Sequence, residues 1–212
     1  MRRLVTALSV VAIAVMAPLA YGQPESFFDW YGYLQLTGAD NTVGTTGVCL
    51  ALFDVVQPDP IFPVDTATNE YTVVLDNMVI SAAVNMGSGN YRTMLSGTQV
   101  RIFEDPLKNA AWAAPGTFVD GTLLLIGGPY TITRFKYSNG TGSFAGDFAW
   151  TGGTRFGDLP GCQENGWRTF GGLSNRVTLP PGFIEAWDGQ FFCNLPVAVN
   201  QGTWGSIKSL YR

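Results

Sequence analysis

The sequence predicts an all-β protein, an antiparallel β-sandwich with one short helix. Charged residues make up only 13% of the chain and 26 residues are glycine, so the charged faces of long surface helices are scarce. Thr, Val and aromatic residues recur between glycine-rich turns, as a pleated sheet favours. In residues 141–151, Phe144, Phe148 and Trp150 share one side of an alternating pattern. A jelly roll and an immunoglobulin-like sandwich fit these observations equally well.

The first segment, residues 1–22, is interpreted as a signal peptide. Arg2 and Arg3 precede an apolar run over residues 4–17, and small residues lead up to a cleavage position after Gly22. The alternative is a retained membrane anchor, for which the run is short. We therefore expect one exported β-sandwich domain over residues 23–212, with no integral membrane segment after cleavage.

The elements follow in order along this domain. One short helix is expected over residues 105–116, because Pro106 suits a first helical turn and Pro115 followed by Gly116 ends it. A bend is expected near Asp76 and Asn77, and residues 152–182 are expected to be rich in loops. The expected strands are 27–36, 48–56, 71–86 (as one strand or two), 91–104 (as two strands around Ser96-Gly97), 117–126, 130–137, 141–151, 167–170, 175–179, 183–187 and 190–193, the last two joined by a turn at Asp188-Gly189.

Three cysteines in an exported chain allow one disulfide. Cys162 and Cys193 both lie near loop-like sequence, whereas Cys49 lies in an apolar run. We predict a Cys162–Cys193 disulfide and a buried, free Cys49. Other pairings and three reduced thiols remain open.

Charge and residue types exclude several functions. The formal net charge is −4 and lysine occurs only at positions 108, 136 and 208, which argues against nucleic-acid binding. The chain has no histidine, which excludes Ser–His–Asp and Cys–His catalysis and histidine metal sites. No cofactor is expected.

Carboxylates are the remaining groups for catalysis. A pair of Asp or Glu side chains can hydrolyse glycosides without histidine. The candidate acids are Asp147, Asp158, Glu164, Glu185 and Asp188. Asp158, Glu164 and Asn165 are the nearest approach to a calcium site. Acids at turns are also ordinary in a solvated β-protein, so a protein without catalytic activity is the favoured interpretation.

Three tryptophans are candidate ligand-binding residues: Trp167, Trp187 and Trp204 lie among glycine and polar residues, as aromatic platforms for sugars do. The competing interpretation places the same rings in the core.

The stretch from Val100 to Thr154 contains VRIFEDP, GTFVDGTLLLIGG and GTGSFAGDFAWTGGT. It resembles uncharacterised secreted bacterial β-strand proteins, some of which carry surface-anchoring tails. The resemblance covers about a quarter of the chain and rests on strand and turn motifs. It implies an extracellular or envelope location, and no activity or functional residue.

The favoured function is that of a secreted, non-catalytic protein with a binding or structural role outside the cell, its partner a polysaccharide or another extracellular protein. Two alternatives are a carboxylate-dependent polysaccharide hydrolase and an outer-membrane β-barrel, for which glycine, aromatic residues and acidity are typical.

Overall fold

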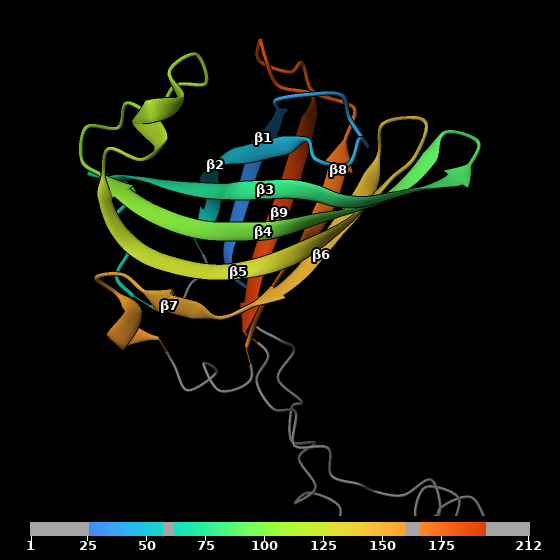
Figure 1. The fold of residues 1–212 in the computed structure, drawn as a ribbon. Helices are drawn as coiled ribbons and strands as arrows, with labels where there is room; N and C mark the ends of the chain where they lie inside the picture. Colours follow the sequence, from blue (N-terminus) through green and yellow to red (C-terminus); the bar gives the residue numbers. More distant parts are fainter. Residues whose placement is uncertain (1–25, 57–61, 160–165, 194–212) are drawn as a thin grey trace, which may run out of the picture. The chain divides into compact units, whose positions relative to one another are not determined.

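A computed structural model describes residues 26–56, 62–159 and 166–193, which form a closed antiparallel β-barrel (Figure 1). Eight strands make the wall, and each pairs with the next wall strand along the chain. The ninth strand, β7, pairs with β5 beside the wall. The strands are β1 (Ser26–Leu36), β2 (Thr46–Val56), β3 (Glu70–Gly87), β4 (Asn90–Asp105), β5 (Thr122–Lys136), β6 (Gly142–Phe148), β7 (Trp150–Gly152), β8 (Trp167–Ser174) and β9 (Glu185–Cys193).

The pairing of β1 with β9 makes this sheet a barrel. Trp30 pairs with Gly189 and Leu34 with Glu185, so the first and last strands meet. The predicted sandwich is therefore wrong, in its jelly-roll and immunoglobulin-like forms alike, whereas the all-β, antiparallel class is confirmed. Both architectures need strands with one buried face, so alternation along the chain does not distinguish them.

Several local expectations are also wrong. The expected strands 117–126 and 130–137 are replaced by one strand, β5, which begins at Thr122, residues 91–104 lie in the single strand β4, and residues 175–179 form no strand. Residues 106–114 form turns rather than a helix, because the Asp105 carboxylate accepts hydrogen bonds from the backbone N–H groups of Leu107 and Asn109. A short 3₁₀ helix, η1 (Pro115–Phe118), follows, and a second, η2 (Phe156–Asp158), lies after β7. The expected turn at Asp188-Gly189 lies inside β9. A Cβ on Gly189 would lie 2.3 Å from the Trp30 ring, so this glycine makes room for the indole.

Aromatic side chains fill the barrel interior. Phe144 stacks on Trp187 with ring centroids 4.3 Å apart, and Trp30 lies 5.6 Å from Phe144. Further along, Phe148 lies 4.9 Å from Trp150. These rings belong to one cluster that contains buried apolar side chains from every wall strand, so the interior is a packed core.

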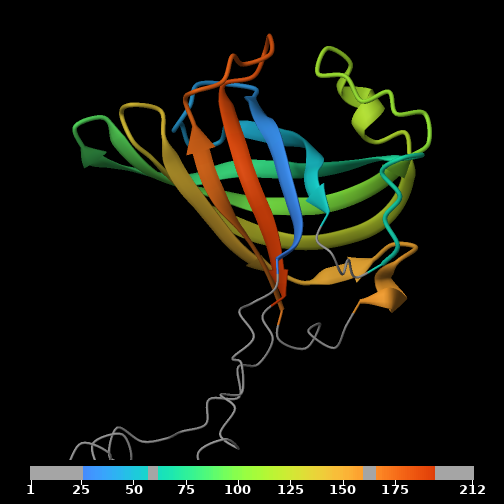
Figure 2. The same cartoon turned by 180° about the vertical axis from the view of Figure 1, so that it is seen from behind.

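A second apolar cluster lies on the outside of the wall. Leu50 and Val74 face outward there, and Phe118 and Phe183 cover them. Trp112 packs between Tyr33 and Phe118, with ring centroids 4.7 Å from each. The turns of residues 106–118 thus form a cover over β2 and β3. Figure 2 shows this cover beside the barrel and the β3–β4 hairpin extending away from the wall on the other side.

Candidate functional site

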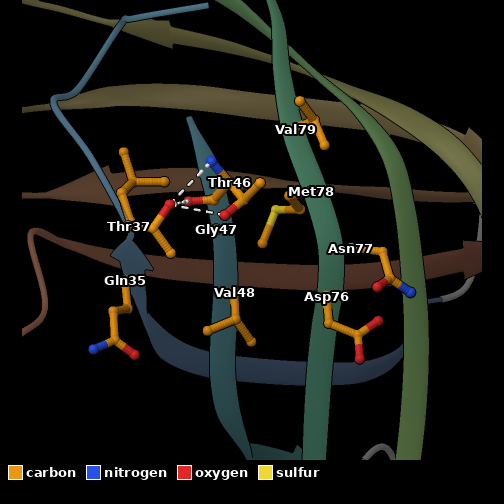
Figure 3. Close-up of a pocket in the computed structure, with 10 residues that line it drawn as sticks. Gln35, Thr37, Thr46, Gly47, Val48, Asp76, Asn77, Met78 and Val79 are labelled. Atoms are coloured by element: carbon orange, nitrogen blue, oxygen red, sulfur yellow. Dashed lines mark hydrogen bonds between the residues drawn. The ribbon is translucent and has the colours of Figure 1, made fainter. Parts of the chain in front are cut away.

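A hollow of about 610 Å³ lies in the wall where β1 ends, β2 begins and β3 bends (Figure 3). Its volume lies within the usual range for small-molecule sites. Gln35 and Thr37 stand on one side of it, with Asp76 and Asn77 on the other. The lining residues are Gln35, Leu36, Thr37, Thr46, Gly47, Val48, Asp76, Asn77, Met78 and Val79.

The bend in β3 creates this hollow. Asn77 has a φ of 55°, and Gly97 on the neighbouring β4 has a φ of 77°. Between the β2 pairs Gly47–Met78 and Cys49–Leu75, the β2–β3 register shifts. The positive φ of Asn77 and the register shift agree with the bend expected at Asp76 and Asn77. The bend makes the outer surface of the wall concave at this point.

The lining of the hollow combines four uncharged polar side chains (Gln35, Thr37, Thr46 and Asn77) with apolar ones, and most of its surface is apolar. The Thr37 and Thr46 hydroxyls lie 2.8 Å apart and hydrogen-bond to each other. Asn77 donates from Nδ2 to Gln99 at 3.2 Å. Leu36, Val48 and Val79 supply the apolar surface.

Asp76 is the one carboxylate in the hollow, and it is already neutralised. Its Oδ2 accepts a hydrogen bond from Arg101, whose guanidinium also lies 5.4 Å from the centre of the Phe103 ring. Its Oδ1 is buried and has no hydrogen-bond partner among the described residues. The carboxylate of Asp76 therefore adds no net charge to the hollow.

A smaller hollow, of about 210 Å³, lies near Tyr31, Glu70 and Lys108. Its charged groups hold the outer cover in place. Glu70 accepts a hydrogen bond from the backbone of Ala110, and Lys108 donates to the carbonyls of Thr66 and Ala67. Because its volume is below the usual range for ligands, we assign it a structural role.

Four charged side chains form a cluster inside one end of the barrel. Arg134 is fully buried and donates to Glu185 at 3.2 Å, and to Asp40 and Asn41 at 2.5 and 2.9 Å. Lys136 donates a hydrogen bond from Nζ to Asp40 Oδ2 at 2.8 Å, and the same Nζ lies 3.1 Å from Glu185 Oε1. Asp40 and Asn41 belong to the β1–β2 loop, which the cluster thus ties over the barrel end.

The ion pairs of this cluster shift two pKa values. Burial alone would raise the pKa of Asp40, but the neighbouring Arg134 and Lys136 hold it below its ordinary value. Burial alone would lower the pKa of Lys136, but Glu185 and Asp40 raise it. Both groups therefore stay charged around neutral pH, and the loop stays anchored. This cluster was not predicted from the sequence. The alternation in residues 130–136 could have indicated it, because Arg134 and Lys136 share the side of the strand on which Tyr130 and Ile132 lie.

Two of the three candidate tryptophans, Trp167 and Trp187, do not lie on the surface. Trp167 and Trp187 are both buried inside the barrel, and Trp187 donates from Nε1 to Glu185 at 2.7 Å. Neither ring is accessible as a stacking platform, so both belong to the core. Trp204 lies outside the described residues.

The candidate acids are dispersed. Glu185 points inward and Asp188 points outward from the same strand, β9. Asp147 forms an exposed ion pair with Arg168, and Asp158 forms one with Arg155. Burial raises the pKa of Asp188, and the carboxylates of Asp54 and Asp29 raise it further. Asp188 lines neither of the two hollows. Glu164 and Asn165 lie outside the described residues, so the calcium site was not tested.

Cys49 is a free, buried thiol, as predicted. Burial raises its pKa far above the ordinary value, so it stays protonated. Cys193 is buried at the end of β9. Cys162 lies outside the described residues, and its disulfide with Cys193 stays a prediction.

Within residues 26–56, 62–159 and 166–193, no helix has the length and apolarity needed to cross a membrane. No protein-family model, curated protein or solved structure matches this chain. The function is therefore argued from the geometry alone.

Proposed function

We propose that this protein is an exported binding protein whose barrel wall holds a small, neutral, hydroxyl-bearing ligand, such as one sugar unit of a polysaccharide. The observation that carries the proposal is the hollow between β1, β2 and β3, which combines polar side chains on two sides with an apolar floor.

The chemistry of the lining supports a neutral ligand. Asp76 is paired with Arg101, so the hollow has little net charge to attract a cation. An anion would in addition lie close to the negative carboxylate of Asp76. The amides of Gln35 and Asn77 can donate hydrogen bonds to ligand hydroxyls and accept hydrogen bonds from them. A sugar ring presents hydroxyls at its rim and C–H groups on its face, and the C–H face suits Leu36, Val48 and Val79.

The same lining disfavours hydrolysis. Glycoside hydrolysis by carboxylates uses two acids that flank the bond, and the hollow contains Asp76 alone. The proposal is therefore binding without turnover.

Affinity electrophoresis of residues 23–212 through gels cast with soluble neutral polysaccharides (dextran, xylan and β-glucan) tests this proposal. We expect retardation by at least one polymer. Gln35→Ala and Asn77→Gly should each weaken that binding about three- to tenfold, the effect of losing one hydrogen bond. Asn77→Gly keeps the positive φ of 55° accessible while removing the amide.

Gln190→Ala is the matched control, because Gln190 is a half-buried, outward glutamine on β9 that is absent from the hollow. Retardation that all three variants lose equally, or no retardation by any polymer, would contradict the proposal.

The barrel also agrees with the architecture of the smallest outer-membrane proteins, which close eight antiparallel strands. The placement of side chains favours an aqueous environment instead. Membrane barrels have an apolar outer band and a polar interior, whereas here the interior is aromatic. Asp147, Arg168 and Asp188 lie on outward positions of neighbouring strands, where charge is costly in lipid.

A further inference from the structure

A row of three side-chain hydroxyls crosses the outer wall on β3, β4 and β5. Ser81, Ser96 and Thr131 supply these hydroxyls, one from each strand. The Oγ atoms of Ser81 and Ser96 lie 2.6 Å apart, and Thr131 donates from Oγ1 to Ser96 at 3.2 Å. Ser81 is exposed, and the other two side chains are half-buried. This hydroxyl row is therefore continuous from strand to strand and accessible from solvent.

The hydroxyl row begins where the hollow ends. Val79 lines the hollow, and it pairs with Thr46 on β2 and with Ser96 on β4. In Figure 3, Val79 stands on the side of the hollow away from Gln35. From Thr46 to Thr131 the surface crosses from β2 to β5, roughly 14 Å at about 4.8 Å per strand. One sugar ring does not reach this far, so the row extends beyond a single sugar unit held in the hollow.

The direction of the hydrogen bonds within the row determines what it can bind. Ser81 also donates from Oγ to the carbonyl oxygen of Met94, at 3.3 Å. A hydroxyl has one hydrogen and two acceptor lone pairs, so Ser96 must be the donor to Ser81. All three hydroxyl hydrogens are then used within the protein, and each oxygen keeps at least one lone pair. The row therefore accepts hydrogen bonds, and its ligand has to donate them.

The surface around the row is uncharged and partly apolar. The strand segments that carry it, residues 79–83, 94–96 and 131–133, contain no charged residue. Val79 and Met94 are 38% and 39% exposed, and they supply apolar surface beside the hydroxyls. An anion would find no cation in these segments and has no hydrogen to donate to the row. This surface thus repeats the chemistry of the hollow, with polar groups beside exposed apolar side chains.

We propose that the hydroxyl row is a second subsite for a neutral polysaccharide chain, which runs from the hollow across β3 and β4 to β5. This inference rests on the proposed function, because the hollow holds the first sugar unit. A glycan carries hydroxyl donors along its whole length, and its C–H faces suit Val79 and Met94. Asp147, on the neighbouring β6, is in an ion pair with Arg168 and adds no net charge at the end of the row. The ligand is therefore a chain of several sugar units rather than a free monosaccharide.

NMR titration of isotope-labelled residues 23–212 tests the second subsite, because it measures weak as well as tight binding. The probes are glucose, xylose and the six-unit isomalto-, xylo- and gluco-oligosaccharides. We expect a six-unit chain to bind at least tenfold more tightly than its single sugar. Ser96→Ala and Thr131→Val should each weaken six-unit binding about three- to tenfold, the effect of one lost hydrogen bond, and leave single-sugar binding unchanged.

Ser143→Ala is the matched control, because Ser143 is an exposed, outward serine on β6 that lies outside the row. Thermal unfolding checks that each variant keeps its fold. Equal affinity for a single sugar and its six-unit chain, or equal effects of Ser96→Ala and Ser143→Ala, would overturn the second subsite alone. Gln35→Ala should weaken the binding of both probe lengths, since it acts in the hollow. Absence of binding to every probe would overturn the proposed function together with this inference.

Discussion

At the scale of single residues, the buried charge cluster is the most sensitive part of the barrel. Arg134 is fully buried and Glu185 nearly so, and each compensates the other's charge. Arg134→Met should lower the free energy of unfolding by about 3–5 kcal/mol, because Glu185 and Asp40 lose their main partner inside the barrel. Urea denaturation followed by tryptophan fluorescence measures this change.

Arg155→Met is the control for that prediction, since it breaks an ion pair of the same type on the surface. Arg155 and Asp158 lie 3.2 Å apart, with side chains 39% and 46% exposed. Exposed pairs contribute below about 1 kcal/mol, so this variant should unfold almost like the parent. Equal destabilisation by the two substitutions would show that burial of the cluster does not matter.

At the scale of elements, two adjacent glycines in β8, Gly171 and Gly172, differ in how much space surrounds their Cα atoms. A Cβ on Gly171 would lie 2.0 Å from the carbonyl oxygen of Asp188 and 2.6 Å from the Phe144 ring, whereas on Gly172 the nearest atom is 3.9 Å away. Gly171→Ala should therefore destabilise the protein by at least about 1–3 kcal/mol, the cost of overpacking. Thermal unfolding measures it.

Gly172→Ala in the same strand should stay within about 0.5 kcal/mol of the parent. If both glycines tolerated alanine, β8 would not approach β9 and Phe144 as closely as described. The contrast depends on which face of β8 each residue occupies, because alternate residues point to opposite sides of the wall.

Alternation along strands was the part of the fold that the sequence revealed best. Phe28, Trp30 and Leu34 share one side of the first predicted strand, and all three are buried in the barrel. Closure was not visible, because it depends on pairing between strands at opposite ends of the chain. The turn predicted at Asp188-Gly189 was wrong for the same reason. Gly189 leaves space for the ring of Trp30, which lies on a strand far away in the sequence.

The candidate site was only partly predictable. The bend at Asp76 and Asn77 was visible, but the hollow needs β1 and β2 beside that bend. The charge cluster joins Arg134 to Asp40 across 94 positions of the chain, a distance at which no local pattern indicates contact. Trp167 and Trp187 were proposed as surface residues because their sequence neighbours are small and polar, whereas their own side chains point inward.

At the scale of the whole molecule, the barrel has an aromatic interior and carries charged residues at outward positions of β6, β8 and β9. Residues 23–212, expressed with residues 1–22 in a Gram-negative host, should appear in the soluble periplasmic fraction or the medium. The physical reason is the outward charge on β6, β8 and β9 and the aromatic interior. A known outer-membrane barrel of the host is the control. Retention in the membrane pellet after carbonate washing would contradict this prediction and favour insertion.

The junction of β1 and β9 has a consequence for how the protein is made. Residues 26–36 cannot find their second neighbour until residues 185–193 have been synthesised, because β9 lies between β1 and β8. Contacts this far apart in the chain slow folding. During synthesis, β1 and β8 would each present an unpaired edge, and the nascent chain would remain open until its last strand arrived. Delayed closure of this kind is compatible with passage through a translocation channel in an unfolded state, and it makes β9 the segment that completes the barrel.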